Sequence, residues 1–435
     1  MDDMLDALDI DDVDDLFSDI PEAIRIDGLD LPVGMCEREV ERHIDGLLNQ
    51  NRSFKDMPSF LGGGIQPHYV PPAVEYIVAR SEFLTSYTPY QPEFSQGILQ
   101  AMFEYQSIIC ELTGMDVANV SMYDAATALG EAAGMVARST RGSIFLLPEN
   151  LSPEKKSVLE NYLKSTDLTI QEIPLVDGRV DLDAAAALTD DAAGIYLENP
   201  NYYGLIEDRV DDVKQLASSM DAMLIMGIDP LLAAVTPPPS DYGADIVIGD
   251  GWFGSPMNYG GIRLGLFACR REHIRQMPGR IIGATRDGDG KRAFCMTLQT
   301  REQHIRRERA TSNICTNQAL SAVAFAAYAA LHGTSGLHNL AAENMRQARY
   351  TAEQLAGIGF TLPYRGPIFN EFVAVPPINA RRLNEELRPQ GIQGGLPLVQ
   401  GPDNALLYGV TEMHTRDMID DMVAATVDIM EGHHV

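Results

Sequence analysis

Short apolar segments alternate with helical segments between residues 144 and 248, and this alternation limits the possible folds more than any other feature of the chain. One of the intervening helices is predicted at Val210–Met220. Strands are predicted at Ile144–Leu147, Thr169–Pro174, Gly194–Leu197, Met223–Ile228 and Ile246–Ile248. Continuously apolar strands separated by helices are typical of a parallel sheet covered on both faces. The middle of the chain therefore predicts an α/β fold.

The segments on either side of this region have different patterns of predicted secondary structure. Residues 1–60 are predicted to form a helical N-terminal arm, with a short amphipathic helix near Leu16–Ile24 and a second helix near Arg38–Leu48. Residues 61–332 are predicted to form a large α/β domain. Residues 333–435 are predicted to form a smaller α+β domain, with helices at Leu337–Ala356, Arg381–Leu387 and Asp417–Met430 and strands at Glu371–Val375 and Ala405–Gly409.

The chain is strongly acidic, with a formal net charge of -29 over 435 residues. Binding to nucleic acid depends on clustered lysines and arginines that neutralise phosphates, so this charge argues against a nucleic-acid partner. Lysine is scarce. Either a salty cytoplasm or a simple requirement for solubility explains an acidic surface poor in lysine.

The cysteines and the N-terminus give no indication of a secreted, metal-binding or membrane protein. The 5 cysteines are widely spaced and contain no Cys-x-x-Cys pair, so we expect reduced, mostly buried thiols and no metal site. The N-terminus is acidic where a signal peptide would be basic. No apolar run reaches the roughly 18 residues of a membrane span. We therefore expect a cytoplasmic protein without a membrane partner.

Two loops display polar side chains at defined places. The stretch Phe60–Pro72 is too rich in glycine and proline for a helix or a strand, and it carries His68. In the stretch Ser86–Gly97, two prolines bracket Tyr90 and Gln91. Because proline restricts its own backbone and that of the preceding residue, we expect an extended segment that presents these side chains.

A glycine-rich loop follows the last of the predicted parallel strands. It runs over Gly249–Gly261 and leads into a second apolar strand predicted at Ile262–Phe267. Before this region, Asp124 is predicted to be the N-cap of a helix. After it, a mixed-charge segment that begins at Arg301 precedes an alanine-rich helix at Asn317–Leu331.

Four motifs together carry a resemblance to a known family. They are Tyr87–Gly97 (YTPYQPEFSQG), Ser121–Ala128 (SMYDAATA), the Gly249–Gly251 turn and Arg301–Thr316 (REQHIRRERATSNICT). With these motifs the chain resembles the glycine dehydrogenase (decarboxylating) family, the P-protein of the glycine cleavage system, and more narrowly its subunit 1. It departs from the family in a loop that is usually less aromatic, at Trp252, Met257 and Tyr259.

This resemblance implies a fold and an assembly. The implied fold is the aspartate-aminotransferase type (fold type I) of the pyridoxal-phosphate-dependent transferases, with a mainly parallel large domain and a smaller α+β domain. The implied enzyme is a heterotetramer in which subunit 2 carries pyridoxal phosphate on a lysine. It decarboxylates glycine and transfers the aminomethyl group to the lipoyl arm of the H-protein. The present chain is expected to be inactive alone, and it could homodimerise without its partner.

The resemblance also implies that this chain binds no cofactor. Counting back from Pro256 places the position of the cofactor-binding lysine on Gly251, which has no amine. The cofactor's phosphate normally docks at a helix N-terminus, where the carboxylate of Asp124 would satisfy the N–H groups and repel a dianion. Asp229 stands where this fold keeps an acid for the pyridine nitrogen. A simpler explanation is that Asp229 is a turn residue at the end of a strand, directly before Pro230.

The remaining candidates are side chains that would complete the partner's active site. Four lie on the proline-flanked segment, namely Tyr87, Tyr90, Gln91 and Glu93. Hydroxyl and amide donors orient a carboxylate-bearing substrate on which charge develops, although tyrosines are also common in subunit interfaces. His68 and Asn313 are predicted in the same role. The alternative for His68 is a structural role, in which it bonds within its own loop. The alternative for Asn313 is that it belongs to a polar cluster that caps the next helix.

Two other functions stay open. One is a catalytically inert scaffold for the same complex. The other is an independent pyridoxal-phosphate enzyme that uses an unusual lysine, for which Lys291 is the candidate, although its Gly- and Asp-rich surroundings indicate a solvated loop.

Overall fold

The computed structural model describes residues 2–26, 28–188, 191–257, 260, 263–315 and 317–432. The chain divides into two compact units, Met1–Ser53 and Phe54–Val435. The predicted division of the second unit into domains at residue 332 stays a prediction.

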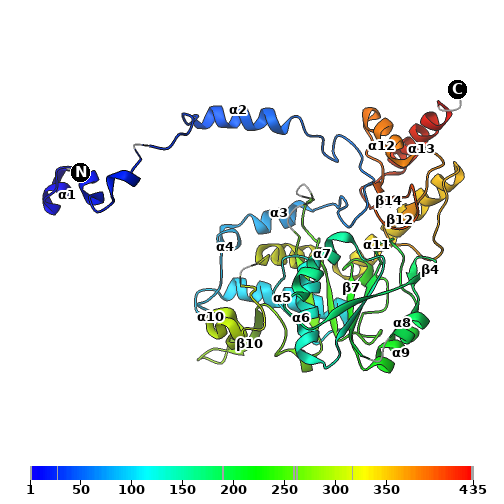
Figure 1. Cartoon of the computed structure of the whole chain (residues 1–435), viewed down its shortest axis with the longest axis horizontal. Helices are drawn as coiled ribbons and strands as arrows, with labels where there is room; N and C mark the ends of the chain where they lie inside the picture. Colours follow the sequence, from blue (N-terminus) through cyan, green and yellow to red (C-terminus); the bar gives the residue numbers. More distant parts are fainter. Residues whose placement is uncertain are drawn as a thin grey trace. The chain divides into compact units, whose positions relative to one another are not determined.

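The first unit is built from short helices that bury no side chain (Figure 1). They are α1 (Asp2–Leu8), η1 (Val13–Phe17), η2 (Glu22–Ile24) and α2 (Glu37–Leu48). The second predicted helix of the arm is confirmed by α2. The first is wrong, because two separate 3₁₀ turns replace a continuous helix. Pro21 lies between these turns, and it lacks the N–H and disfavours helical backbone at Ile20.

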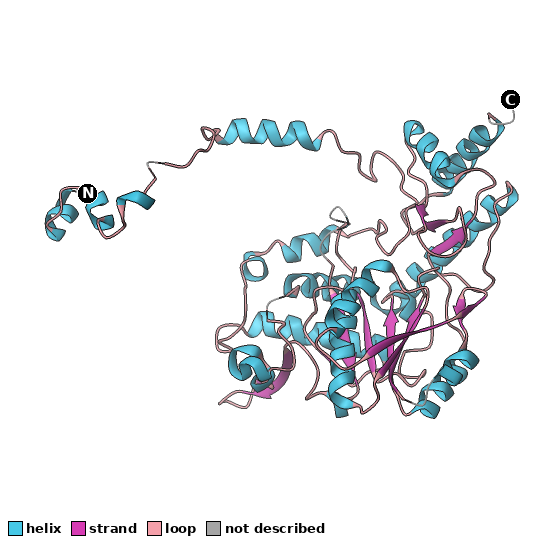
Figure 2. Cartoon of the chain, in the orientation of Figure 1, coloured by secondary structure: helices cyan, strands magenta, loops and turns pink. Residues whose placement is uncertain are grey.

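The second unit is organised around a seven-stranded sheet in the order β1-β9-β8-β7-β6-β2-β3 (Figure 2). The strands of this sheet are β1 (Val117–Ala118), β2 (Ile144–Pro148), β3 (Thr169–Ile173), β6 (Ala192–Asn199), β7 (Met223–Ile228), β8 (Ile246–Asp250) and β9 (Gly265–Cys269). Strands β3, β2, β6, β7 and β8 are parallel, β9 is antiparallel to β8, and β1 is antiparallel to β9. The mainly parallel sheet is confirmed. The predicted start of the last strand, Ile262, lies outside the described residues.

Both faces of this sheet are buried, which explains the continuously apolar strands. Phe145 and Leu147 point to the face covered by α6 (Ala125–Ser139) and α7 (Pro153–Leu163), while Leu146 points to the other face. That second face is covered by α5 (Gln96–Thr113), α8 (Leu182–Leu188), α9 (Val210–Met220) and the first half of α11 (Ala319–Gly357).

The C-terminal part has its own small sheet and core. Strands β12 (Glu371–Ala374), β14 (Leu406–Gly409) and β13 (Leu396–Pro397) are antiparallel and pack with α12 (Ala380–Leu387), α13 (Arg416–Glu431) and the second half of α11. The two helices predicted on either side of residue 333 join as α11, with a kink at Gly333. In the described part of the chain, α11 alone is long and apolar enough to span a membrane. Its buried Phe325 and Tyr328 belong to the core.

Several smaller elements differ from the predictions. Two short helices, α3 (Pro72–Val78) and α4 (Ser81–Leu84), precede the proline-flanked segment, and a hairpin of β10 (Ile281–Arg286) and β11 (Arg292–Thr297) was not predicted. The mixed-charge segment forms only the short turns η6 (Gln299–Arg301), α10 (Gln303–Arg306) and η7 (Arg307–Arg309). The remaining described elements are β4 (Leu175–Val176), β5 (Arg179–Val180), η3 (Leu232–Ala234), η5 (Arg271–His273) and η8 (Arg388–Gln390). Only Cys269 of the five cysteines is buried, so the prediction of mostly buried thiols is wrong.

Candidate functional site

A polar cavity of about 130 Å³ lies at the carboxyl ends of the parallel strands. This edge is where ligands bind in open α/β sheets. The charged side chains that line it come from separate segments of the second unit, and they are Lys155, Glu198, Asp229, Asp250, Arg263 and Glu371.

The helix N-terminus beside this cavity is already occupied by carboxylates. Asp124 caps α6 by accepting a hydrogen bond from the Thr127 amide at 2.7 Å, which confirms the predicted N-cap. Asp250 Oδ1 accepts the amide of Ala125 at 2.9 Å. A phosphate dianion would therefore meet two carboxylates instead of free N–H groups, and like charges repel strongly in a poorly solvated site.

The turn after β8 presents no amine to the cavity. The two residues of this turn that line it are Asp250 and Trp252. Gly251 faces elsewhere, because a Cβ at this position would meet side-chain carbons of Leu266 and Leu264 at 2.8 and 2.9 Å. Extending the side chain of residue 251 would drive it into an apolar wall.

A lysine does reach the cavity from an unexpected element. Lys155 lies in the first turn of α7, and its Nζ contacts Glu198 Oε1 at 2.6 Å. Burial opposes its charge, but the carboxylates of Glu198, Asp250 and Glu371 outweigh burial and raise the pKa of Lys155. An ammonium that keeps its proton is no nucleophile. Lys291, the candidate from the sequence, lies on the β10–β11 hairpin with its side chain 75% exposed, and it does not line the cavity.

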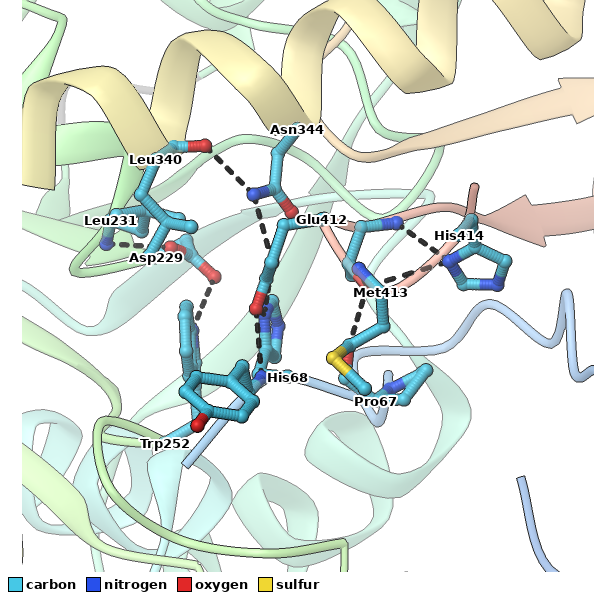
Figure 3. A network of polar contacts seen from close by, with 12 residues as sticks. Pro67, His68, Asp229, Leu231, Trp252, Leu340, Asn344, Glu412, Met413 and His414 are labelled. Atoms are coloured by element: carbon cyan, nitrogen blue, oxygen red, sulfur yellow. Dashed lines mark hydrogen bonds and ion pairs between the residues drawn. The ribbon is translucent and has the colours of Figure 1, made fainter. Parts of the chain in front are cut away.

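Next to the cavity, a buried network joins the sheet to the C-terminal part (Figure 3). The His68 ring stacks on Trp252 with 3.5 Å between centroids, and Trp252 Nε1 donates to Asp229 Oδ2 at 3.1 Å. His68 Nδ1 lies 3.0 Å from Glu412 Oε2, which also accepts a hydrogen bond from Asn344 Nδ2 at 3.0 Å. The network therefore connects β7, the loop after β8, the loop of residues 60–72, α11 and the segment after β14.

Burial and pairing set the charges in this network. Burial raises the pKa of Asp229, although Trp252 and the amides of Leu231 and Leu232 partly offset it. For Glu412 the balance is reversed. Burial opposes its charge, but His68, the Tyr69 amide and Asn344 together lower the pKa of Glu412 to about 2.

These observations show that the cavity does not suit pyridoxal phosphate. The helix N-terminus is capped by Asp124 and Asp250, and the amine of Lys155 is held as an ammonium. Two of the acids, Asp229 and Glu371, are used by the protein's own donors.

The proline-flanked segment lies between α4 and α5 and is exposed. Tyr87 is 72% exposed and Tyr90 is 50% exposed, and Gln91 and Glu93 are also at the surface. This segment has no helix or strand before the turn at residues 92–94, as its prolines predict. The structure therefore brings these four candidates together and leaves His68 buried elsewhere, with its side chain 5% exposed.

Arg280 holds this exposed segment in place. Its guanidinium donates to Thr88 Oγ1 at 3.3 Å and to the Tyr90 hydroxyl at 3.4 Å. It also donates to Cys315 Sγ at 3.5 Å and lies 3.7 Å from Glu302 Oε2. This role was not predicted, since Arg280 lies outside the four motifs.

Asn313 lies apart from the cavity, on the surface beside a groove formed by α6 and α7. The prediction that the polar cluster before the alanine-rich helix caps it is wrong. The N-cap of α11 is Gln318, and Ser312 Oγ instead donates to Glu131 Oε1 at 2.9 Å. The start of the mixed-charge segment is not a solvated face either, because Arg301 is buried and donates to the carbonyls of Met277 and Gly279.

Among the described residues, one group of side chains could hold a metal ion, and it comprises Asp245, Glu272 and His273. The Arg270 guanidinium lies 3.5 Å from the same Asp245 oxygen that faces His273. The Leu224 amide donates to the other oxygen of Asp245 at 2.9 Å. This carboxylate is therefore committed to holding the chain together.

Comparison with known proteins identifies the family. The family model described as glycine cleavage system P-protein matches residues 1–426. A probable glycine dehydrogenase (decarboxylating) subunit 1 of Desulfitobacterium hafniense is 43% identical over 424 residues, which are 96% of this chain and 95% of the relative. One from Moorella thermoacetica is 45% identical over 425 residues, with the same shares covered.

Solved structures agree with these sequence matches. A crystal structure of glycine decarboxylase (P-protein) of the glycine cleavage system, in inhibitor-bound form, superposes with a TM-score of 0.92 at 37% identity and covers 98% of this chain and 97% of that one. An alanine–glyoxylate aminotransferase from Nostoc sp. shares only the fold, at 17% identity with a TM-score of 0.60 over 88% of this chain and 99% of its own. The fold is thus the fold-type-I fold of the pyridoxal-phosphate-dependent transferases, and the chain belongs to the glycine cleavage system P-protein family as a subunit 1 member.

Proposed function

We propose that this chain is the cofactor-free subunit of a heteromeric glycine decarboxylase. The observation that carries the proposal is the state of the cavity at the sheet edge. Two carboxylates take the helix N-terminus, the turn after β8 presents Asp250 and Trp252, and Lys155 is paired with Glu198. A chain of this family with such a cavity needs a second subunit to hold pyridoxal phosphate.

In this proposal the partner is glycine dehydrogenase subunit 2. It would carry the pyridoxal phosphate on a lysine, and the bound cofactor would supply an electron sink for the bond that breaks when glycine loses its carboxylate. The aminomethyl group then passes to the lipoyl arm of the H-protein. The reaction belongs in the cytoplasm, and it requires neither nucleic acid nor a membrane.

The present chain would complete the partner's active site with its exposed proline-flanked segment. Tyr87, Tyr90 and Gln91 offer hydroxyl and amide groups that can hold a carboxylate or a developing negative charge. Glu93 offers an acceptor for an amine. Arg280 bonds Tyr90 and Thr88 from behind, so the segment can reach the partner without first being ordered. Asn313 stays a candidate from the surface beside α6.

His68 is better suited to a different task. Its ring is buried between Trp252 and Glu412, so it cannot extend out of this chain without breaking both contacts. We assign it to holding the C-terminal part against the sheet.

The proposal is tested by replacing Tyr90 with phenylalanine in the co-expressed complex. Losing one hydroxyl that bonds a charged group should lower kcat/KM for glycine by about ten- to hundredfold, while the amount of assembled complex stays the same. Tyr76→Phe on α3, also exposed and bonded to an arginine, is the matched control and should leave turnover unchanged. A Tyr90→Phe complex with full turnover would indicate a pure scaffold.

A further inference from the structure

The cavity at the sheet edge contains hydrogen-bonding groups that the protein leaves unused. The side chain of Asn370 lines it, is 4% exposed, and bonds to no other residue that the structure describes. Buried amides almost always have partners. An amide that is buried and still open to a cavity therefore indicates a group that enters the cavity.

Three carboxylates in the same cavity are also only half used. Glu198 Oε1 accepts from Lys155 and the Tyr196 hydroxyl, Asp250 Oδ1 from the Ala125 amide, and Glu371 Oε1 from the amides of Gly63 and Gly64 and from Gln66. Within the described ranges, the second oxygen of each has no hydrogen-bond partner. All three carboxylates line the same cavity as Lys155, and Glu198 contacts its Nζ directly.

These groups define the chemistry of a ligand. The lining offers free acceptors on the three carboxylates and free donors on Lys155, Asn370 and Arg263, so a ligand that carries both N–H donors and carboxylate acceptors fits it. The ammonium of Lys155, which uses one of its three N–H groups on Glu198, and the amide of Asn370 can bind a carboxylate. The cavity is small, about 130 Å³. A divalent metal ion is disfavoured, because Lys155 already places a positive charge among these carboxylates.

We propose that this cavity is a binding site for a small zwitterionic α-amino acid, with its ammonium among Asp250, Glu198 and Glu371 and its carboxylate on Lys155 and Asn370. The site lies in this chain alone and is separate from the exposed segment at Tyr87–Glu93. Because a ligand that binds only the folded state stabilises it, such a site would make the stability of this subunit respond to the amino-acid concentration.

The test uses the purified full-length chain and measures glycine binding by calorimetry and thermal unfolding. Glycine should bind saturably and raise Tm, whereas methylamine and acetate, which each carry half of its charges, should bind at least tenfold more weakly. Leucine should not bind, because its side chain exceeds the cavity. Methylamine binding as tightly as glycine, or leucine binding at all, would overturn the proposal, as would the absence of any glycine binding at millimolar concentrations.

A variant ties the binding to this cavity. Asn370→Leu has a similar shape and removes an amide that bonds to nothing else, so it should fold, and it should weaken glycine binding at least tenfold. Asn161→Leu on the exposed face of α7 is the matched control and should bind like the unchanged chain. Should Asn370→Leu not fold, Asp250→Asn takes its place with the same expectation. Unchanged glycine affinity in the folded variant would refute the site. Since neither partner nor turnover is involved, either result leaves the proposed function untouched.

Discussion

At the scale of single residues, charge burial decides what this chain can do. Lys155 and Glu412 are both ion-paired and largely removed from water, and each is surrounded by groups that keep it charged. For Lys155 this prevents nucleophilic chemistry. For Glu412 it creates an attachment between the loop of residues 60–72, α11 and the segment after β14.

Removing the charge of Glu412 should be costly. Glu412→Gln removes the buried carboxylate that contacts His68 Nδ1, the Tyr69 amide and Asn344, and breaking a buried pair in this way typically costs about 3 kcal/mol or more. The control is Glu353→Gln, which removes an exposed partner of Arg349 and should change stability by less than about 0.5 kcal/mol. Urea unfolding at neutral pH measures both. Equal stabilities of the two variants would contradict the importance of this pair.

The same carboxylate predicts a dependence of stability on pH. Because the pKa of Glu412 is lowered to about 2 from its ordinary 4.5, its contribution is present above pH 4.5 and is lost as pH falls toward 2. The contribution is about 3 kcal/mol. Asp229 and Glu371 have raised pKa values, so their contributions are lost instead as pH rises, and they oppose this trend.

The measurement is therefore the difference between the unchanged chain and Glu412→Gln, followed by unfolding from pH 7 to pH 2. This difference should shrink as the pH falls. A constant difference would show that Glu412 does not titrate as an ion-paired group.

At the scale of elements, the kink in α11 has a specific backbone requirement. Gly333 has φ 60° and ψ -177°, a conformation open essentially to glycine alone, and a Cβ there would meet no atom within 4 Å. Gly333→Ala should therefore cost about 1–3 kcal/mol through backbone strain only.

Gly357→Ala is the control for this change. It lies at the end of the same helix, where a Cβ also has open space, and alanine favours helix more than glycine does. It should leave stability unchanged or raise it. Thermal unfolding that ranks the two variants in the opposite order would contradict the assignment of the kink.

The elements also show how far the sequence determines the structure. Val210–Met220 and Met223–Ile228 are found at their predicted bounds, because apolar periodicity and flanking polar residues mark them locally. The β10–β11 hairpin was missed, since Gly283, Arg286 and Arg292 interrupt the alternation of its strands. The candidates on the proline-flanked segment follow from local chemistry. Lys155 does not, because its partner Glu198 is 43 residues away and only tertiary packing joins them.

At the scale of the whole molecule, the two units have very different internal support. The described residues of Met1–Ser53 bury no side chain, although α2 carries Val40, Ile44 and Leu47 on one helical face. Phe54–Val435 contains all the cores described above. We expect this apolar face to bind a partner subunit, because rows of exposed apolar side chains are typical of protein-binding surfaces.

Deleting residues 2–53 should therefore separate folding from assembly. The remaining chain should unfold at the same urea concentration as the full chain, because no core is removed. Its association with subunit 2 should weaken at least tenfold, measured by sedimentation at a fixed partner concentration. The double variant Val40→Ser, Ile44→Ser should reproduce part of this loss, and unaltered assembly of the truncated chain would rule out the arm as a contact.

The central claim is that pyridoxal phosphate in the assembled enzyme sits on the partner and never on this chain. Borohydride reduction of the complex, followed by mass spectrometry of both subunits, tests it directly. The account predicts a pyridoxyl-lysine on subunit 2 and none on the present chain, Lys155 included. A pyridoxyl adduct on Lys155, or on any other lysine of this chain, would contradict it.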